Sequence, residues 1–411
     1  MIDINLIREN PEKVKKGVER KHYDPGLVDA FLKLDADWRV GKKEIDELRA
    51  KQKTFGPESR EEAKAIKEQI AAKEEATVGL EKERQAILEQ IPNIPADDVP
   101  DGKDDTENVV LKQVGDRPEF GFEPKDYLSL AGKLINTEQA AKIASSRFGY
   151  IFGDLARLEF ALVKLAMDTL TPYGFIPTIP PVMVKPEIMK GMGKQKFLEA
   201  GDAFYIGEDN LYLVGSSEHS IGPLHMDEIL DEESLPRRYM GFSTCFRREA
   251  GSYGKDTKGI LRVHQFDKVE MFSFVKPEDS EEEHRFLLAR EEELLGKLKL
   301  PHQVMSICTG DMGFGDYRQF DVETWLPGQG KYRETMSCSN TGDFQSRGLN
   351  IKYRVKSTGE SKYVHTLNAT AFAVGRMLIA ILENYQTESG EVLVPEVLRD
   401  FVGKEKLSIP R

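Results

Sequence analysis

Residues 246–272 read FRREAGSYGKDTKGILRVHQFDKVEMF and decide the fold of the larger part of the chain. A β-rich start, a middle rich in Gly and Lys, and an alternating end predict a β-hairpin with a long loop. Arginine suits an α-phosphate because its planar fork binds two oxygens at once. A charged surface hairpin would show the same pattern, so both interpretations stay open at this point. Four cations within sixteen residues could surround a polyphosphate: Arg247, Lys255, Lys258 and Arg262.

A second segment, residues 332–340, reads YRETMSCSN and combines a carboxylate with small hydroxyl residues. Glu334 and Ser337 could present oxygens to Mg²⁺, a hard cation that prefers such ligands together with phosphates. A polar strand with satisfied side chains is the alternative. The sequence contains no GxxxxGK[ST] and no GxGxxG after a strand. A bound nucleotide would therefore be held neither by a P-loop nor by a dinucleotide fingerprint.

A third segment, residues 367–384, reads LNATAFAVGRMLIAILEN and joins a polar strand end to an apolar helix. Small residues allow this helix to pack closely, while Arg376 lies within it. A lone arginine on a helix usually makes a surface ion pair. If the helix lines a pocket, Arg376 becomes a phosphate or cation–π ligand instead.

The N-terminal part has a different pattern, typical of two long helices between about residues 27 and 91. Spacings of three and four place one seam on each helix. The Gly-Pro pair within residues 54–59 stops a helix, so the two seams can bury each other in an antiparallel hairpin. The first seam runs through Phe31, Leu34, Trp38, Gly41, Ile45, Leu48, Gln52 and Phe55; the second runs through Ala63, Ile66, Ile70, Lys73, Thr77, Leu80, Arg84, Ile87 and Ile91.

Charge is distributed unevenly along this hairpin. Residues 39–73 hold ten basic and seven acidic side chains, whereas the whole chain has a formal charge of −12. A solvated coiled-coil surface that mixes both signs is one interpretation. A basic projection that grips a phosphate backbone is the other, and composition does not choose between them.

The overall composition, with 411 residues of which 39% are hydrophobic and 31% charged, is that of a soluble globular protein. The start MIDINLIRENPEKVKK has no apolar core, and no long uncharged apolar stretch follows, so we expect neither secretion nor membrane spanning. Three cysteines far apart (Cys245, Cys308 and Cys338) argue against a disulfide framework and a Cys-rich zinc site. We expect a cytoplasmic protein.

A Pro/Asp/Gly-rich link at 96–105 follows the hairpin and predicts a boundary between two domains, residues 1–108 and 109–411. In the second part, a helical pattern (about 137–170) and short β-rich runs such as 204–206, 211–214 and 269–274 are separated by Gly-rich loops. This arrangement, without a regular βαβ alternation, predicts an α+β domain with an antiparallel sheet.

Taken in order, these segments resemble the signature motifs of the class II aminoacyl-tRNA synthetases, and the match narrows to the seryl-tRNA synthetase family. Residues 174–181 (GFIPTIPP) are similar to motif 1, the dimer-forming element. Residues 246–272 are similar to motif 2, with the seryl-type string AGSxGxDTxGxxRxHQFxKVE, and 367–386 are similar to motif 3. MIDINLIRENPEKV, the helical hairpin, IPNIPADDVPDGKDD and SCSNTGDFQSR follow in family order.

The resemblance implies a class II catalytic domain with an N-terminal helical arm that binds tRNA. It implies ATP-dependent ligation of L-serine to tRNA(Ser) through a seryl-adenylate, with tRNA(Sec) as a second acceptor, by a cytoplasmic homodimer that uses Mg²⁺ and no zinc. Neither step needs a protein nucleophile, so positioning and electrostatic stabilisation must supply the rate.

The resemblance also assigns roles in ATP binding and catalysis. Arg247 would hold the α-phosphate and the serine carboxylate, and Phe266 would stack on adenine with Arg376 on the other side of the ring. The motif 2 carboxylate Glu249 would contact ATP. Glu334 and Ser337 would contact ATP and Mg²⁺; the residues with catalytic roles are thus Arg247, Arg376 and Glu334.

Serine selection follows from a further set of residues in the family pattern. Glu218, preceded by Ser216, would receive the α-amino group. Glu270 would accept a hydrogen bond from the substrate hydroxyl, with Thr370 as second partner. A site built around that hydroxyl rejects alanine by ~10⁴–10⁵, because Glu270 would otherwise be buried and unpaired.

Some positions depart from the commonest bacterial pattern. Ser216 replaces a threonine, Ala369 and Thr370 stand where Gly-Ser is frequent, and Gly348 replaces a second basic residue. The arm is also several residues shorter than common examples.

Two other classes of function compete with the synthetase. One is a relative that charges a carrier protein, which would lack the arm and bind zinc. The other is a degenerate paralogue that only binds tRNA, which would have broken motif residues.

Overall fold

The computed structural model describes residues 1–55, 59–251, 254, 256 and 258–409, which form two compact units, Met1–Ile94 and Pro95–Arg411. The predicted boundary lay later, after residue 108. The link packs within the second unit, where the Ala96 N–H donates to Tyr317 O (2.9 Å) and Val99 is buried with Met312. Apolar residues in the link therefore move the division between compact units to residue 94.

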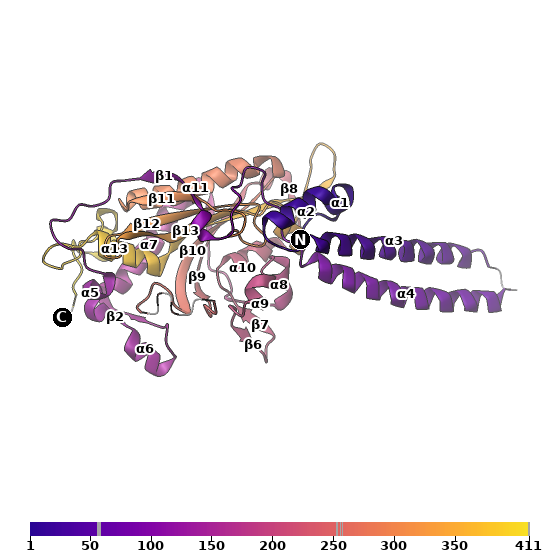
Figure 1. Ribbon diagram of the computed structural model, residues 1–411, viewed down its shortest axis with the longest axis horizontal. Coiled ribbons are helices and arrows are strands. Elements are labelled where there is room, and N and C mark those ends of the chain that lie inside the picture. The colour runs from indigo at the N-terminus through magenta and orange to yellow at the C-terminus, as the bar shows by residue number, and fades with distance from the viewer. Residues whose placement is uncertain (56–58, 252–253, 255, 257, 410–411) are drawn as a thin grey trace. The chain divides into compact units, whose positions relative to one another are not determined.

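The first unit is helical. It contains α1 (Ile4–Glu9), α2 (Pro11–Arg20), α3 (Gly26–Gln52) and α4 (Arg60–Leu88). Helices α3 and α4 lie side by side (Figure 1). Ion pairs join the two helices, between Glu44 and Lys73 (2.5 Å) and between Arg49 and Glu74 (2.6 Å). The predicted helical hairpin is present; of the turn expected at 54–59, residues 56–58 lie outside the described part of the chain.

Gly41 on α3 and Thr77 on α4 have no large apolar side chain, but they fit each other where the two helices meet. A Cβ added at Gly41 would lie 2.8 Å from Thr77 Oγ1, and Thr77 is buried. The helices therefore approach closely where one of them has no side chain. Nearer the base of the hairpin, the buried Asp35 carboxylate pairs with Arg8 (2.8 Å), Arg39 (3.2 Å) and Arg84 (3.5 Å).

The second unit is built on an eight-stranded sheet in the order β1-β11-β12-β13-β16-β10-β9-β4. Neighbouring strands are antiparallel except β4 and β9, so the predicted α+β class with an antiparallel sheet is confirmed. The strands are β1 (Val109–Val114), β4 (Phe175–Thr178), β9 (Arg237–Phe246), β10 (Gln265–Val275), β11 (His302–Ser306), β12 (Arg318–Leu326), β13 (Lys331–Asn340) and β16 (His365–Ala373).

One face of the central strands packs against three helices, α7 (Gly153–Leu170), α11 (Ser280–Lys297) and α13 (Val374–Asn384). Val269, Met271, Ala369 and Cys338 from the sheet share one apolar core with these helices. Because side chains alternate along a strand, the intervening residues of β10, β13 and β16 lie on the opposite face. That face carries the polar residues singled out in the sequence.

Smaller elements surround the sheet. The helical pattern expected at 137–170 is divided into α6 (Thr137–Ile143) and α7 by the short strand β3 (Tyr150–Ile151), which pairs with β2 (Ile135–Asn136). Two three-stranded sheets contain β5 (Met183–Val184), β6 (Tyr205–Ile206) and β7 (Leu211–Leu213), and β8 (Ile229–Asp231), β14 (Lys352–Arg354) and β15 (Ser361–Tyr363).

The remaining helices are short. They are α5 (Tyr127–Ala131), α8 (Pro186–Gly191), α9 (Gln195–Glu199), α10 (Glu218–Ile221), α12 (Phe344–Leu349) and α14 (Arg399–Val402), with 3₁₀ turns η1 (Asp105–Glu107), η2 (Gly132–Leu134), η3 (Thr171–Tyr173), η4 (Gly222–His225), η5 (Glu232–Ser234), η6 (Pro277–Asp279) and η7 (Glu396–Leu398). In the described part of the chain, the helices are all too short or too polar to cross a bilayer.

Candidate active site

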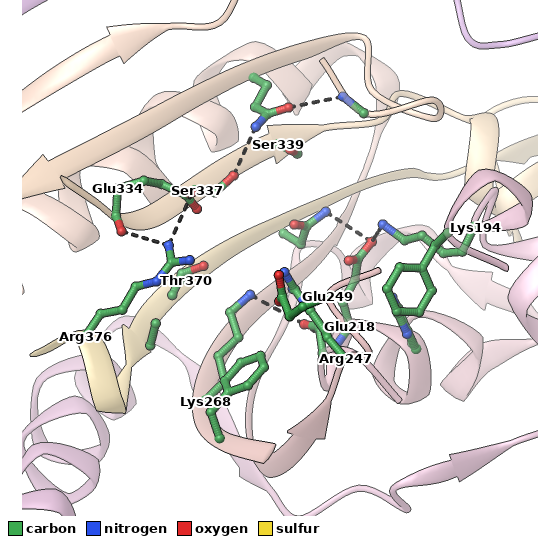
Figure 2. A pocket seen from close by; sticks show the side chains of 18 of the residues that line it. Lys194, Glu218, Arg247, Glu249, Lys268, Glu334, Ser337, Ser339, Thr370 and Arg376 are labelled. Atoms are coloured by element: carbon green, nitrogen blue, oxygen red, sulfur yellow. Dashed lines mark hydrogen bonds and ion pairs between the residues drawn. The ribbon is translucent and has the colours of Figure 1, made fainter. Parts of the chain in front are cut away.

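A cavity of about 460 Å³ opens on the polar face of the sheet in the second unit. It collects residues from β10, β13, β16 and α13 and from the loops before α9 and α10 (Figure 2). Nine of the ten predicted site residues line it: Ser216, Glu218, Arg247, Glu249, Phe266, Glu334, Ser337, Thr370 and Arg376. The tenth, Glu270, is 1% exposed and forms an ion pair with Lys268, which lines the cavity.

Arg247 follows β9 directly and is fixed by its neighbours. Its backbone N–H donates to His264 O (3.0 Å), and its Nε donates to Gly215 O (3.0 Å). The guanidinium carbon lies 5.5 Å from the ring centre of Phe266. The two terminal nitrogens are therefore carried by a side chain that is anchored at Nε and directed into the cavity.

A β-bulge determines where Glu334 points. Strict alternation along β13 would place Glu334 on the same face as the buried Met336, but the pairing with β12 shifts at Thr335. The extra residue turns Glu334 to the cavity face, as bulges commonly re-aim a side chain. There Arg376 Nη1 donates to Glu334 O (2.8 Å) and lies 3.2 Å from Glu334 Oε2. Although desolvation raises the pKa of Glu334, Arg376 and Arg247 lower it below its ordinary value.

Glu218 begins α10 and is almost completely buried. Its Oε1 lies 2.9 Å from Lys194 Nζ and accepts hydrogen bonds from Gln345 Nε2 (2.8 Å) and Asn368 Nδ2 (3.4 Å). Burial raises the pKa of Glu218, but Lys194, the neighbouring His219 and Gln345 outweigh it and lower the pKa to about 2. Glu218 is therefore an ionised carboxylate with a cationic partner.

Glu270 lies opposite Thr370 in the register of β10 and β16. Its ion-pair partner Lys268 also approaches Ser216, with 3.5 Å between Lys268 Nζ and Ser216 Oγ. Burial raises the pKa of Glu270 above its ordinary value. The two residues expected to recognise a hydroxyl group are thus brought together from neighbouring strands.

Glu249 and Ser337, which also line the cavity, have partners of their own. Glu249 forms an ion pair with Arg262 (2.5 Å). Ser337 Oγ accepts from Gln319 Nε2 (3.3 Å). Of the four cations expected to surround a polyphosphate, Arg247 and Arg262 line the cavity, Lys258 is not among the lining residues, and Lys255 lies outside the described residues.

Comparison with known proteins follows the same division of the chain. Residues 1–95 match the family described as "Seryl-tRNA synthetase N-terminal domain", and residues 204–385 match "tRNA synthetase class II core domain (G, H, P, S and T)". The serine--tRNA ligase of Rhodococcus jostii is 45% identical over 99% of this chain and 100% of its own. That of Dictyoglomus turgidum is 43% identical over 98% of both chains. The chain belongs to the seryl-tRNA synthetase family.

A solved structure agrees with this membership. The crystal structure of seryl-tRNA synthetase from Pyrococcus horikoshii complexed with ATP has a TM-score of 0.94 and 37% identity, with 100% of both chains covered. The expected fold, a class II core with an N-terminal helical arm, is therefore confirmed. A synthetase that charges tRNA with serine is the enzyme class of this family.

Sequence reasoning missed several residues of the cavity. Lys194 and Gln345 both contact Glu218. Lys194 lies in none of the quoted motifs, and Gln345 lies in the SCSNTGDFQSR segment, where no role was assigned to it. Lys268 lies inside the FDKVE part of motif 2, and its position two residues before Glu270 on the same strand face could have revealed the pair. The described residues hold no group of three or more His, Cys, Asp or Glu side chains placed to bind a metal ion.

Proposed function

We propose that the cavity forms seryl-adenylate from L-serine and ATP and then transfers the seryl group to the terminal ribose of tRNA(Ser). The observation that carries this proposal is the convergence of Arg247, Glu218, Glu334 and Arg376 on one cavity from four separate segments, with Glu270 held beside it by its ion pair with the lining residue Lys268. Family membership supports the overall reaction. The chemistry needs positioned charges rather than a protein nucleophile, which agrees with this set of residues.

In the activation step, the two terminal nitrogens of Arg247 would hold the α-phosphate and the serine carboxylate, bringing nucleophile and phosphorus together. Phe266 would stack on adenine with Arg376 on the far side of the ring, and Glu249 would contact ATP. The 5.5 Å approach of Arg247 to the Phe266 ring supports this, since it places the phosphate ligand beside the stacking surface. Negative charge that develops on the phosphate would be stabilised by a guanidinium that is already oriented.

Two groups of serine would be recognised, its α-ammonium group and its side-chain hydroxyl group. The ionised Glu218 suits the α-ammonium group, and Ser216 adds a hydroxyl beside it. Glu270 and Thr370 would bind the side-chain hydroxyl from opposite strands. Burial of Glu270 supports this role, because a substrate without the hydroxyl would leave a buried carboxyl short of a hydrogen bond.

Glu334 and Ser337 fit a magnesium ion that arrives with ATP. Both present hard oxygen donors on the cavity side of β13, and Glu334 is half exposed. Mg²⁺ keeps waters and phosphate oxygens among its ligands, so two protein donors suffice. When bound, the ion would neutralise negative charge on the phosphates of ATP.

The helical arm would hold tRNA through its basic outer portion, and tRNA(Sec) is a second acceptor to test in a charging assay.

A homodimer is also part of the proposal. Ile176 on β4 and Ile179 directly after it, both in the region that resembles motif 1, are 53% and 84% exposed, and Phe160 on α7 is 58% exposed. Exposed apolar side chains of this kind suit burial against a second copy. The three free cysteines agree with a reducing, cytoplasmic location.

The test is ATP–pyrophosphate exchange measured with each amino acid in turn, followed by charging of tRNA(Ser) and tRNA(Sec). Exchange should require serine. Exchange with a different amino acid but none with serine would overturn the proposed substrate. A chain that lacks residues 27–91 should retain exchange and lose charging of tRNA; unchanged charging would contradict the role of the arm.

A further inference from the structure

Lys194 is a charged cavity residue to which the proposed reaction gives no role. It lies in the turn between α8 and α9, and its Nζ contacts Glu218 Oε1 at 2.9 Å inside the cavity (Figure 2). This ammonium group has the same chemistry as the α-ammonium group of an amino acid. The protein therefore already places a cation at the carboxylate that is proposed to bind the substrate's cation.

The other donors to Glu218 are anchored in the core, whereas Lys194 is not. Gln345 Oε1 accepts from Thr366 Oγ1 (2.9 Å), which fixes the amide that donates to Glu218. Asn368 belongs to the central strand β16 and is buried. Lys194 reaches Glu218 from a loop through a flexible stem of four carbons, so it is the donor that can leave without disturbing the sheet.

A second carboxylate provides a place for the displaced lysine. Asp316 lines the same cavity and accepts a hydrogen bond from Ser339 Oγ (3.1 Å). The charges of both Glu218 and Asp316 raise the pKa of Lys194 against the opposing effect of burial, so both carboxylates lie within electrostatic reach of its ammonium group. Two ammonium groups on one buried carboxylate would repel each other, which favours their separation once the substrate arrives.

We propose that Lys194 is an internal ammonium group that occupies Glu218 in the empty site and moves toward Asp316 when the ammonium group of the amino acid binds. The inference rests on the proposed role of Glu218 in serine binding. Before the substrate binds, Lys194 then compensates the buried negative charge of Glu218. For the same reason its ammonium group competes with the ammonium group of the substrate. Because every amino acid has the same ammonium group, Lys194 sets affinity and leaves the preference for serine over alanine unchanged.

The experiment is equilibrium binding of L-serine without ATP, measured by titration calorimetry on the full chain. Lys194→Met keeps much of the stem and removes the charge; it should bind serine about five- to tenfold more tightly, since the substrate no longer displaces a charged partner. The ratio of the exchange rates with serine and alanine should stay within twofold of that of the unchanged chain. Lys190→Met, at an exposed position of α8, is the matched control and should bind serine normally.

A second variant tests the destination. Asp316→Asn should weaken serine binding, because the displaced lysine loses its new partner, and this effect should vanish in the Lys194→Met background. Unchanged or weaker serine binding by folded Lys194→Met would overturn the inference, as would equal effects of Asp316→Asn in both backgrounds. If the unchanged chain neither binds serine nor shows serine-dependent exchange, the proposed function itself fails, which is a distinguishable result.

Discussion

Replacement of Arg247 by lysine keeps the positive charge of the side chain and removes its planar fork. Two contacts are then lost. The Nε bond to Gly215 O (3.0 Å) has no counterpart in lysine, and a single ammonium group cannot bind two ligand oxygens in the same plane. Hydrogen bonds that involve a charged group contribute about 1.5–3 kcal/mol each, so the two losses together amount to about 3–6 kcal/mol.

This energy corresponds to a fall of roughly 10²- to 10⁴-fold in kcat/KM for serine-dependent ATP–pyrophosphate exchange. The matched control is Arg248→Lys, since Arg248 Nε donates to Ala203 O (3.1 Å) and its guanidinium lies over Phe204 (4.3 Å). The control should stay within a few-fold of the unchanged chain. Exchange by Arg247→Lys within tenfold of the unchanged chain, with normal thermal unfolding, would refute the argument that the fork of Arg247 holds the reacting groups.

Three further changes test other parts of the molecule. Glu270→Gln should reduce the ratio of serine to alanine activation by at least ~10²-fold in the exchange assay, because the buried hydroxyl acceptor is replaced by an amide; an unchanged ratio would exclude Glu270 from selection. Asp35→Asn leaves three arginines around a neutral buried group and should destabilise the arm by about 3–5 kcal/mol. This variant should charge tRNA poorly while ATP–pyrophosphate exchange persists. The sensitivity of residues 26–88 to protease measures the loss of stability. Burial and the neighbouring Asp267 raise the pKa of Glu159 to about 8. Its favourable contribution to the free energy of unfolding is therefore complete below about pH 4.5 and is lost as the pH rises through 8. The midpoint temperature of unfolding should fall between about pH 6 and 8.5, and Glu159→Gln should make this fall smaller.

The arm illustrates how far periodicity predicts structure. Spacings of three and four identified both helices, because they report which residues share a face. They said nothing of how one face meets the other. Neither Gly41 nor Thr77 has a large apolar side chain to fill a seam, yet the two fit each other, since a Cβ at Gly41 would lie only 2.8 Å from Thr77 Oγ1. Complementarity is a property of the pair, and a single sequence does not show which residues form pairs.

The cavity shows the same limit for polar residues. The motif resemblance identified Glu334, but strict alternation would have placed it beside Met336 on the helix-covered face; the bulge at Thr335 that reverses this depends on the pairing of β13 with β12. Lys194 and Gln345 approach Glu218 from distant segments of the chain. Their roles arise from tertiary structure, so no local pattern indicates them.

Two buried carboxyls in this cavity have opposite properties, and the difference follows from their partners. Glu218 and Glu270 are both almost fully buried, which raises the pKa of each. Glu218 has a lysine and two amide donors on one oxygen, and its pKa falls to about 2. Glu270 has Lys268 as its partner among the described residues, and its pKa stays above the ordinary value.

This contrast suits the two groups of serine. A carboxylate that stays ionised in a buried site attracts an ammonium group strongly, because the surrounding dielectric is low. A carboxyl that keeps hydrogen-bonding capacity can instead bind a hydroxyl group. Lys268 contacts Glu270 at Oε2, so among the described residues that ion pair leaves the lone pairs of Oε1 able to accept from a hydroxyl group. The donors around each carboxyl, rather than the depth of burial, therefore support the proposed binding of the substrate's ammonium group by Glu218 and of its hydroxyl group by Glu270.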